Sequence, residues 1–217
     1  MSVNHIFIFT DKYNQVAQEL LDFGFTEGSN RIHPGQGTRN RKFNFNNFYI
    51  EILWVHDENE INSIVTRPTQ LNKRANWEDN DCSPFGLCLD YNSNENRLFE
   101  EHFKYKPSYL PDGMEIQVLT NESNPYLPWT FRWKTDRTID SNSSKTEEPL
   151  NHQNNIKTLT KVCFGIKKLN SSYVDFFNNS NFVFFEKSES SYLKLEFDNK
   201  KSNKIKKFDT IPLTIKY

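Results

Sequence analysis

Glycine is scarce in this sequence of 217 residues, which contains only seven. The glycines form no G-x-G-x-x-G, P-loop or G-x-S-x-G motif, and the three cysteines form no paired CxxC motif. These motifs position a phosphate, a nucleophilic serine or a structural zinc ion. Nucleotide-binding, serine-hydrolase and zinc-ribbon functions therefore have no support in the sequence.

An excess of charge of one sign is also missing. Lys and Arg number 27 against 28 Asp and Glu, so the net charge is −1. A chain with this balance has no overall field to hold nucleic acid or an anionic membrane surface. No run approaches the roughly 20 apolar residues that a membrane span needs, and the N-terminus resembles no signal peptide. We expect a soluble, cytoplasmic protein with neither nucleic acid nor membrane as partner.

Aromatic residues, by contrast, are abundant, with 19 Phe, 9 Tyr and 4 Trp. They supply apolar surface for a core or a pocket wall, which excludes disorder throughout the chain. Two of the three cysteines, Cys88 and Cys163, lie in strand-like runs, where a free thiol behaves as a small hydrophobic group. We therefore expect the cysteines to be reduced and structural.

The first 57 residues read as a strand, a helix and further strands. HIFIFT is a short β run, and residues 16–23 have apolar side chains at helical spacing before Gly24. RKFNFNN and FYIEILWV are strand-like runs joined by Asn46-Asn47, which suits a hairpin turn. The sequence predicts a βαβββ module over residues 1–57.

The same order of elements begins twice more, within one domain over residues 1–217. Residues 83–135 contain a strand, a helix over 95–103 and two further strands, and residues 156–217 form a closing module. The polar segment 136–155 between them lacks aromatic residues and is predicted to be a mobile, exposed loop. The predicted fold class is α+β, with repeated strand-helix-strand modules.

The alternation of side chains along two predicted strands brings a histidine and a carboxylate together. His5 shares a face with Phe7 on the first strand, and Glu51 shares a face with Tyr49 and Leu53 on FYIEILWV. If the helix covers the opposite faces, His5 and Glu51 point into one cavity. A buried charge needs a partner, so this pair is either a metal site or a structural hydrogen bond, with Arg39 or Arg41 as the alternative counter-ion of Glu51.

The loop IHPGQGTRNR (residues 32–41) contains two glycines and a Pro-Gly turn signal at the entry to these strands. Polar groups on a rigid turn at a cavity mouth suit a small-molecule site, although they can equally satisfy the backbone of the loop itself. The residues predicted to bind substrate are His33, Gln36, Thr38, Arg39 and Asn40, together with Trp54 if the assignment of strand faces is shifted.

HIFIF, the segment from FGFTEGSN to FYIEILWV, TRPT, SPFGLCLD and IPLTIKY together resemble the glyoxalase-like proteins of the vicinal oxygen chelate superfamily. The resemblance implies βαβββ modules that form a curved mixed sheet around a cavity. It also implies a metal ligand on the first strand of a module and a Glu on its last strand. His5 and Glu51 match these positions, and Glu196 in LEF resembles Glu51 and is a candidate third ligand.

One ligand of the resembled pattern is missing, because PFGLCL and KVCFGI have no His, Gln or Glu at the expected place. Two functions are therefore expected. The first is a metal-dependent lyase, isomerase or dioxygenase with Zn, Mn, Fe or Ni, in which Glu51 is catalytic. The second is a metal-free, cofactor-free protein of the same fold that binds a small molecule. If residues 1–57 need partner strands from another chain, a homodimer follows.

Overall fold

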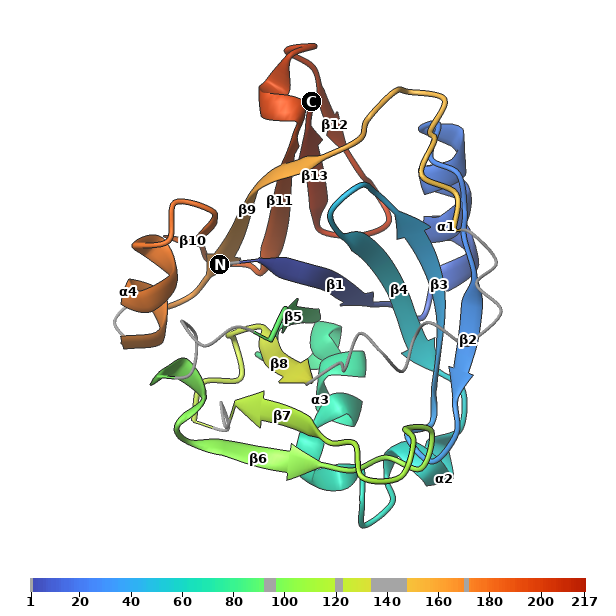
Figure 1. Cartoon of the computed structure of the whole chain (residues 1–217), viewed down its shortest axis with the longest axis vertical. Helices are drawn as coiled ribbons and strands as arrows, with labels where there is room; N and C mark the ends of the chain where they lie inside the picture. The colour runs from blue at the N-terminus through green and yellow to red at the C-terminus, as the bar shows by residue number, and fades with distance from the viewer. Residues whose placement is uncertain (1, 92–96, 120–122, 134–147, 170–171) are drawn as a thin grey trace.

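The computed structural model describes residues 2–91, 97–119, 123–133, 148–169 and 172–217, whose strands form two mixed sheets (Figure 1). In these residues the larger sheet has eight strands, in the order β2-β3-β4-β1-β5-β8-β7-β6. They are β1 (Val3–Phe9), β2 (Asn30–His33), β3 (Thr38–Asn44), β4 (Tyr49–Val55), β5 (Phe85–Leu89), β6 (His102–Tyr105), β7 (Ile116–Leu119) and β8 (Trp129–Trp133). The predicted α+β fold with a curved mixed sheet is confirmed.

Few helices accompany this sheet. Helix α1 (Tyr13–Asp22) follows β1, and four short helical segments lie between β4 and β5. They are α2 (Glu58–Ile61), η1 (Arg67–Thr69), α3 (Leu71–Ala75) and η2 (Trp77–Asp79). None of the helices in the described parts of the chain is long and apolar enough to cross a membrane.

The two halves of the larger sheet repeat one strand order. Strands β1 and β5 pair antiparallel at the centre, and each pairs in parallel with the last strand of its own half, β4 or β8. The order then runs outward through β3 and β2 on one side and through β7 and β6 on the other. Because β1 finds its partner within the chain, strand pairing supplies no reason for the predicted homodimer, and oligomeric state stays a prediction.

The first half follows the local sequence signals closely. Helix α1 buries Val16, Ala17 and Leu20, and it ends before Gly24, which has a φ of +100°. Strands β3 and β4 form the predicted hairpin, whose turn is closed by the bond from the Phe45 amide to the Phe48 carbonyl at 2.8 Å. Side-chain periodicity and turn chemistry are sufficient to specify both features.

The smaller sheet has five strands in the described residues, in the order β10-β9-β11-β13-β12. They are β9 (Leu159–Ile166), β10 (Val183–Lys187), β11 (Tyr192–Phe197), β12 (Ile205–Lys207) and β13 (Leu213–Lys216), with α4 (Ser172–Asn178) and η4 (Asp198–Lys200). The predicted strand-helix-strand order is present, but the pairing differs from that of the first half. Strand β10 pairs in parallel with β9, and residues 179–182 join it to α4.

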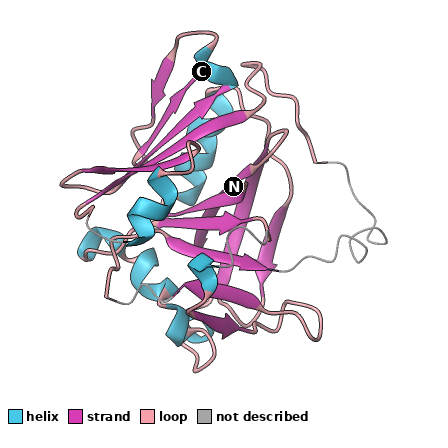
Figure 2. Ribbon diagram, turned by 60° about the vertical axis from the view of Figure 1, so that its left-hand side comes forward, coloured by secondary structure: helices cyan, strands magenta, loops and turns pink. Residues whose placement is uncertain are grey.

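The larger sheet has two different faces. Ile6, Ile8, Ile50 and Ile52 pack with residues of α1, α4 and the smaller sheet in the main core. Figure 2 shows the backbone of the molecule, with helices lying beside the strands. The opposite face forms a second cluster, which includes Phe7, Phe9, Leu53, Trp129 and Phe131 and residues of α2 and α3. The predicted assignment of faces for β1 and β4 is therefore correct, and the second face contains the candidate site.

Close packing across the β1–β5 seam requires a glycine. Gly86 lies opposite Phe7 in the antiparallel register, and a Cβ atom at this position would overlap the Phe7 ring. The aromatic ring thus occupies the place of the absent side chain, as Tyr192 does over Gly165 in the smaller sheet. This contact fixes Phe7 as part of the floor of the second face.

Two segments between the strands depart from prediction. Of the helix predicted over 95–103, residues 95–96 lie outside the described residues, 97–99 form a 3-10 turn and His102 begins β6. Of the predicted mobile loop, residues 136–147 also lie outside the described residues. Residues 148–155, however, pack on the first half: buried His152 accepts a bond from the Thr26 amide and donates one to the Asn44 carbonyl, both at 2.9 Å.

Candidate functional site

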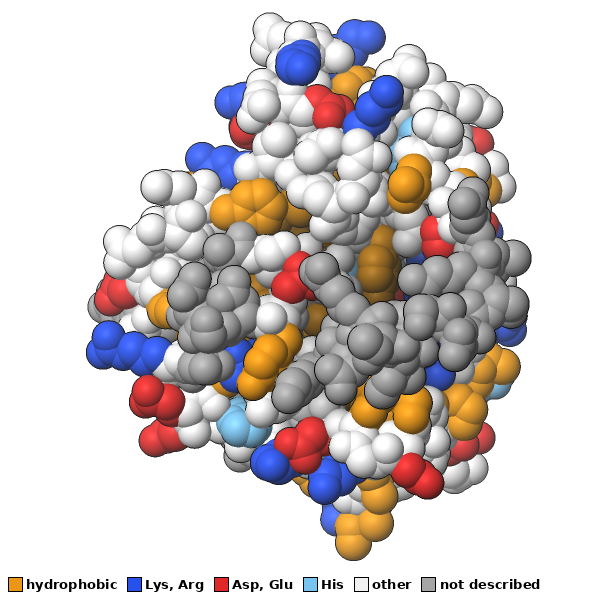
Figure 3. Space-filling model, viewed as in Figure 1, with side chains coloured by type: hydrophobic (Ala, Val, Ile, Leu, Met, Phe, Trp, Pro, Cys, Tyr) orange, Lys and Arg blue, Asp and Glu red, His pale blue; other side chains and the backbone are white. Residues whose placement is uncertain are grey.

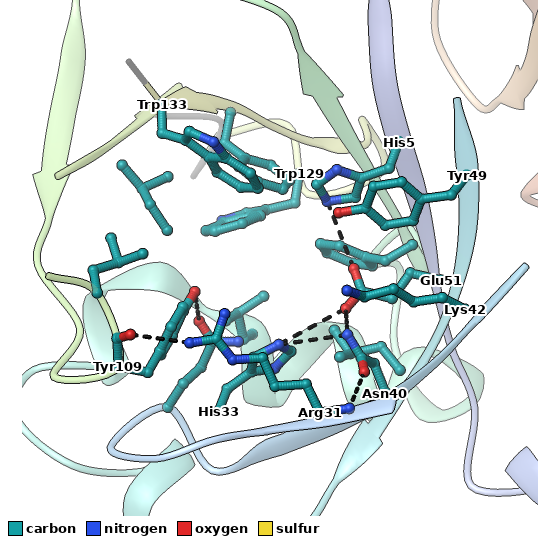
Figure 4. Close-up of a pocket in the computed structure, with 17 residues that line it drawn as sticks. His5, Arg31, His33, Asn40, Lys42, Tyr49, Glu51, Tyr109, Trp129 and Trp133 are labelled. Carbon is teal, nitrogen blue, oxygen red and sulfur yellow. Dashed lines mark hydrogen bonds and ion pairs between the residues drawn. The ribbon is translucent and has the colours of Figure 1, made fainter. Parts of the chain in front are cut away.

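A cavity of about 310 Å³ opens on the second face of the larger sheet (Figure 4). Both halves of the sheet contribute to it. Its lining comprises His5, Phe7, Arg31, His33, Gln36, Asn40, Lys42, Tyr49, Glu51, Leu53, Leu71, Tyr109, Leu110, Ile116, Trp129, Phe131 and Trp133. The volume lies in the range of pockets that bind small molecules, and the mixture of aromatic walls with a few polar groups is typical of them.

Glu51 is the centre of the polar groups in this cavity. Its Oε1 accepts a hydrogen bond from Asn40 Nδ2 and lies 3.9 Å from His33 Nε2, while its Oε2 lies 3.6 Å from His5 Nε2. Burial raises the pKa of the Glu51 carboxyl, against the opposing effects of the Asn40 bond and of the nearby cations. The predicted meeting of His5 and Glu51 in one cavity is therefore found in the structure.

The orientation of the Asn40 amide is fixed by the backbone. Asn40 Oδ1 accepts a bond from the Arg31 amide at 2.7 Å, across the β2–β3 pair. The NH2 group of Asn40 must then face Glu51 and His33, as the bond to Glu51 requires. An amide held in this way presents donors, and not acceptors, to the carboxylate.

His5 is enclosed by aromatic rings. It stacks on Tyr49 with ring centroids 4.4 Å apart and 11° between the planes, and its edges meet Phe131 and Trp133. Burial, followed by the charge of Lys42, lowers the pKa of His5 to about 3. The imidazole is therefore neutral near pH 7.

His33 is held by the predicted loop. Its Nδ1 lies 2.8 Å from the Thr38 hydroxyl, which also accepts a bond from Gln36 Nε2 at 2.7 Å. Gly35 and Gly37 have φ values of +78° and +77°, which the tight turn between β2 and β3 requires. Burial lowers the pKa of His33 to about 3, so this second imidazole is also neutral near pH 7.

Two cations line the cavity, Lys42 on β3 and Arg31 on β2. Lys42 is opposite Glu51 in the β3–β4 register, with its Nζ 5.4 Å from the centroid of the Tyr49 ring. Arg31 lies 5.2 Å from the centroid of the Tyr109 ring and donates to the Tyr109 carbonyl at 3.1 Å. Elsewhere, on the face in Figure 3, Lys and Arg side chains are interspersed with Asp and Glu.

Four residues predicted to belong to the site lie elsewhere. Arg39 is opposite Trp54 in the β3–β4 register, on the face away from Glu51, and its guanidinium lies over the Trp54 ring. Arg41 shares that face and pairs with Glu27. Glu196 lies on β11 of the smaller sheet, 3.4 Å from Lys200. Strand alternation excludes the two arginines and Trp54 from the cavity, and none of these side chains lines it.

Several residues of the site were not predicted from the sequence. Lys42 could have been found, because a hairpin centred on Asn46-Asn47 places it opposite Glu51. The aromatic wall could not, because it comes from distant parts of the chain: Tyr109 lies in a turn and Trp129, Phe131 and Trp133 lie on β8.

Comparison with known proteins agrees with this architecture. Residues 3–169 match the family model described as "Glyoxalase-like domain", and the chain belongs to this family. No curated protein matches the sequence.

Among solved structures, a hypothetical protein from Staphylococcus aureus is similar over 99% of this chain and 98% of its own, with a TM-score of 0.59 and 14% identity. A hypothetical protein from Bacillus halodurans aligns over 62% and 94% (TM-score 0.42, 15% identity). Methylmalonyl-CoA epimerase from Mycobacterium tuberculosis aligns over 64% and 91% (TM-score 0.39, 11% identity). At these identities the likeness concerns the fold alone.

The resemblance noted in the sequence implies a divalent metal, but the residues of this cavity do not fit one. The donor hydrogens of Asn40 Nδ2 are directed into the space between Glu51 Oε1 and His33 Nε2, where a metal ion would need lone pairs. Lys42 adds a positive charge opposite Glu51. No group of three or more His, Cys, Asp or Glu in the described ranges is arranged to hold a metal ion, and Glu196 does not supply the predicted third ligand.

Proposed function

We propose that this glyoxalase-like chain binds a small molecule without a metal, and that its ligand combines a flat apolar body with a negatively charged group. The proposal is supported by one combination of features: an aromatic cavity of about 310 Å³ that contains two cations, and a Glu51 carboxyl group that accepts a hydrogen bond from Asn40 on the side where a metal ion would bind. Each part of this combination restricts the ligand.

The walls favour a flat body. Trp129 and Phe131 have ring centroids 4.6 Å apart, and Trp133 lies 5.7 Å from Phe131, so three rings form one continuous side of the cavity. Stacking and edge contacts with such rings contribute about 0.5–1.5 kcal/mol for each pair beyond the burial of apolar area. A planar or aromatic ligand gains the most from this surface.

The cations favour a negative charge. Lys42 and Arg31 line the cavity, and both histidines are neutral near pH 7. Glu51 opposes an anion only while it is ionised, and burial raises its pKa. The balance of charge facing a ligand is therefore positive.

A metal-dependent lyase, isomerase or dioxygenase, the other function expected from the sequence, has less support. It requires lone pairs from Glu51 and two further ligands to converge on one point. On the Oε1 side of Glu51, toward His33, the Asn40 amide group occupies the place where such ligands would converge, and it is held there by the Arg31 backbone.

Binding can be tested with salicylate and its uncharged counterpart salicylamide, followed by quenching of the fluorescence of Trp129 and Trp133 and by calorimetry in EDTA. We expect salicylate to bind more tightly, and Arg31→Ala and Lys42→Met to weaken it by about five- to tenfold each, or roughly 1–1.4 kcal/mol. Arg39→Ala is the matched control, because Arg39 lies on the same sheet and faces away from the cavity.

Two results would overturn the proposal. One is equal affinity of the acid and the amide, or no binding of either to the folded protein. The other is one equivalent of tightly held metal in protein purified without chelator, lost in both His5→Ala and Glu51→Gln.

A further inference from the structure

The His5–Glu51 contact depends on two residues outside the cavity. We propose that Asn4, oriented by Asp90, is a positioning residue that fixes His5 as the tautomer protonated on Nδ1, so that an unprotonated Nε2 faces Glu51. The tautomer is a property of the ligand-free protein; its importance for a bound molecule rests on the proposed function.

The Asn4 amide has a defined orientation. Its Nδ2 donates to Asp90 Oδ1 at 2.9 Å, because only the NH2 end of an amide can donate to a carboxylate oxygen. The amide oxygen of Asn4 must then point the other way, where it lies 2.9 Å from His5 Nδ1. Because an amide oxygen only accepts, His5 Nδ1 is the donor in this bond.

A bulge in β1 allows the side chains of Asn4 and His5, which are neighbours in the sequence, to contact each other. In a regular strand the side chains of Asn4 and His5 would point to opposite faces of the sheet. The register of β1 against β5 shifts between Val3, opposite Leu89, and His5, opposite Cys88, which leaves Asn4 as an extra residue. Such a bulge redirects a side chain, and bulges are frequent beside functional sites.

The tautomer determines what Glu51 meets. A neutral His5 with its proton on Nδ1 offers a lone pair from Nε2 toward Glu51 Oε2, 3.6 Å away. Two lone pairs repel each other, so the contact is attractive only when a proton lies on one of the two atoms. A neutral carboxylic acid at Glu51 donating toward His5 meets this requirement, while Glu51 Oε1 continues to accept from Asn40.

The groups around this pair agree with such an arrangement. Lys42 faces Glu51 from β3, and His33 approaches the other carboxylate oxygen from β2. Tyr49 covers His5 from β4, and Trp133 and Phe131 cover it from β8. The rings shield His5 from water, so a proton carried by Glu51 Oε2 would have His5 Nε2, 3.6 Å away, as the acceptor that it faces.

The tautomer can be read from the 15N shifts of the imidazole in 15N-histidine-labelled, ligand-free protein. We expect wild-type His5 to be protonated on Nδ1 and unprotonated on Nε2. Asn4→Ala should abolish this preference and give a mixture, and Asp90→Ala should do the same because the Asn4 amide can then turn over. The double variant Asn4→Asp with Asp90→Asn reverses donor and acceptor and should restore the Nδ1–H form.

Asn59→Ala, at an exposed asparagine of α2, is the control and should leave the His5 signals unchanged. A wild-type His5 protonated on Nε2 would overturn the proposal without any variant, even if Asn4→Ala fails to fold. An undiminished Nδ1–H signal in folded Asn4→Ala would overturn it as well. Because no ligand is present, these outcomes are independent of whether salicylate binds.

Discussion

Acidification should weaken the fold through the two buried imidazoles of the cavity. His5 and His33 have pKa values of about 3 in the folded chain, against 6.5 for an unperturbed histidine, chiefly because burial disfavours the charged form. As the pH falls through 6.5, the unfolded chain takes up a proton at each position and the folded chain does not. Stability is therefore lost progressively from above pH 6.5 down to about pH 3.

The expected size of this loss follows from the difference between the histidine pKa values in the folded and the unfolded chain. pH 5 is about 1.5 units below the pKa of a histidine in the unfolded chain, and each unit corresponds to about 1.4 kcal/mol of free energy. His5 and His33 should each lower the free energy of unfolding by about 2 kcal/mol between pH 7 and pH 5. The raised pKa of Glu51 acts in the opposite direction, because the folded chain gains that proton first, so the net loss is smaller than 4 kcal/mol.

Urea unfolding, followed by tryptophan fluorescence at pH 7 and pH 5, measures this loss directly. We expect His5→Gln and His33→Gln each to reduce the pH-dependent loss by about 2 kcal/mol, whatever their stability at pH 7. His56→Gln is the control, because His56 is exposed. The reasoning is refuted if both cavity variants lose as much stability on acidification as the wild type.

Other substitutions test the packing and the hydrogen bonds. Gly86→Ala should lower the free energy of unfolding in urea by about 1–3 kcal/mol, because the Phe7 ring that its Cβ would overlap is buried and cannot move away. Gly165→Ala should cost less, because the Tyr192 ring over Gly165 is only half-buried, and equal costs would contradict this reasoning. Asn40→Ala should cost about 1–3 kcal/mol by leaving Glu51 Oε1 and the Arg31 amide unpaired, and an unchanged midpoint would argue against the network. His152→Phe should cost a similar amount and speed proteolysis within 148–155; unchanged cleavage would show that this histidine does not anchor the segment.

The sequence was sufficient wherever a local period decides the structure. Alternation along β1 and β4 placed His5 and Glu51 on one face, and the same alternation placed Trp54 on the other. The hairpin at Asn46-Asn47 was predictable from turn chemistry, and it carried enough information to place Lys42 opposite Glu51.

Where prediction stopped, the deciding contacts are distant in the chain. The Asn4 bulge exists only in the pairing of β1 with β5, and the aromatic wall depends on how β8 joins β5. Local likeness also misled: Glu196 stands in a strand similar in sequence to β4, but its strand belongs to the other sheet. No pattern within a short window specifies which strands become neighbours.

The division of the cavity between the two halves of one sheet has an evolutionary consequence. The first half provides the imidazoles, Glu51, Lys42 and Arg31, and the second provides most of the ring surface. In a symmetric pair of identical half-sheets every mutation would appear twice, and each copy would have to perform both tasks. In a single chain, a mutation of Trp133 can alter the shape of the ligand that fits the cavity, while His5 on β1 and Glu51 on β4 stay unchanged.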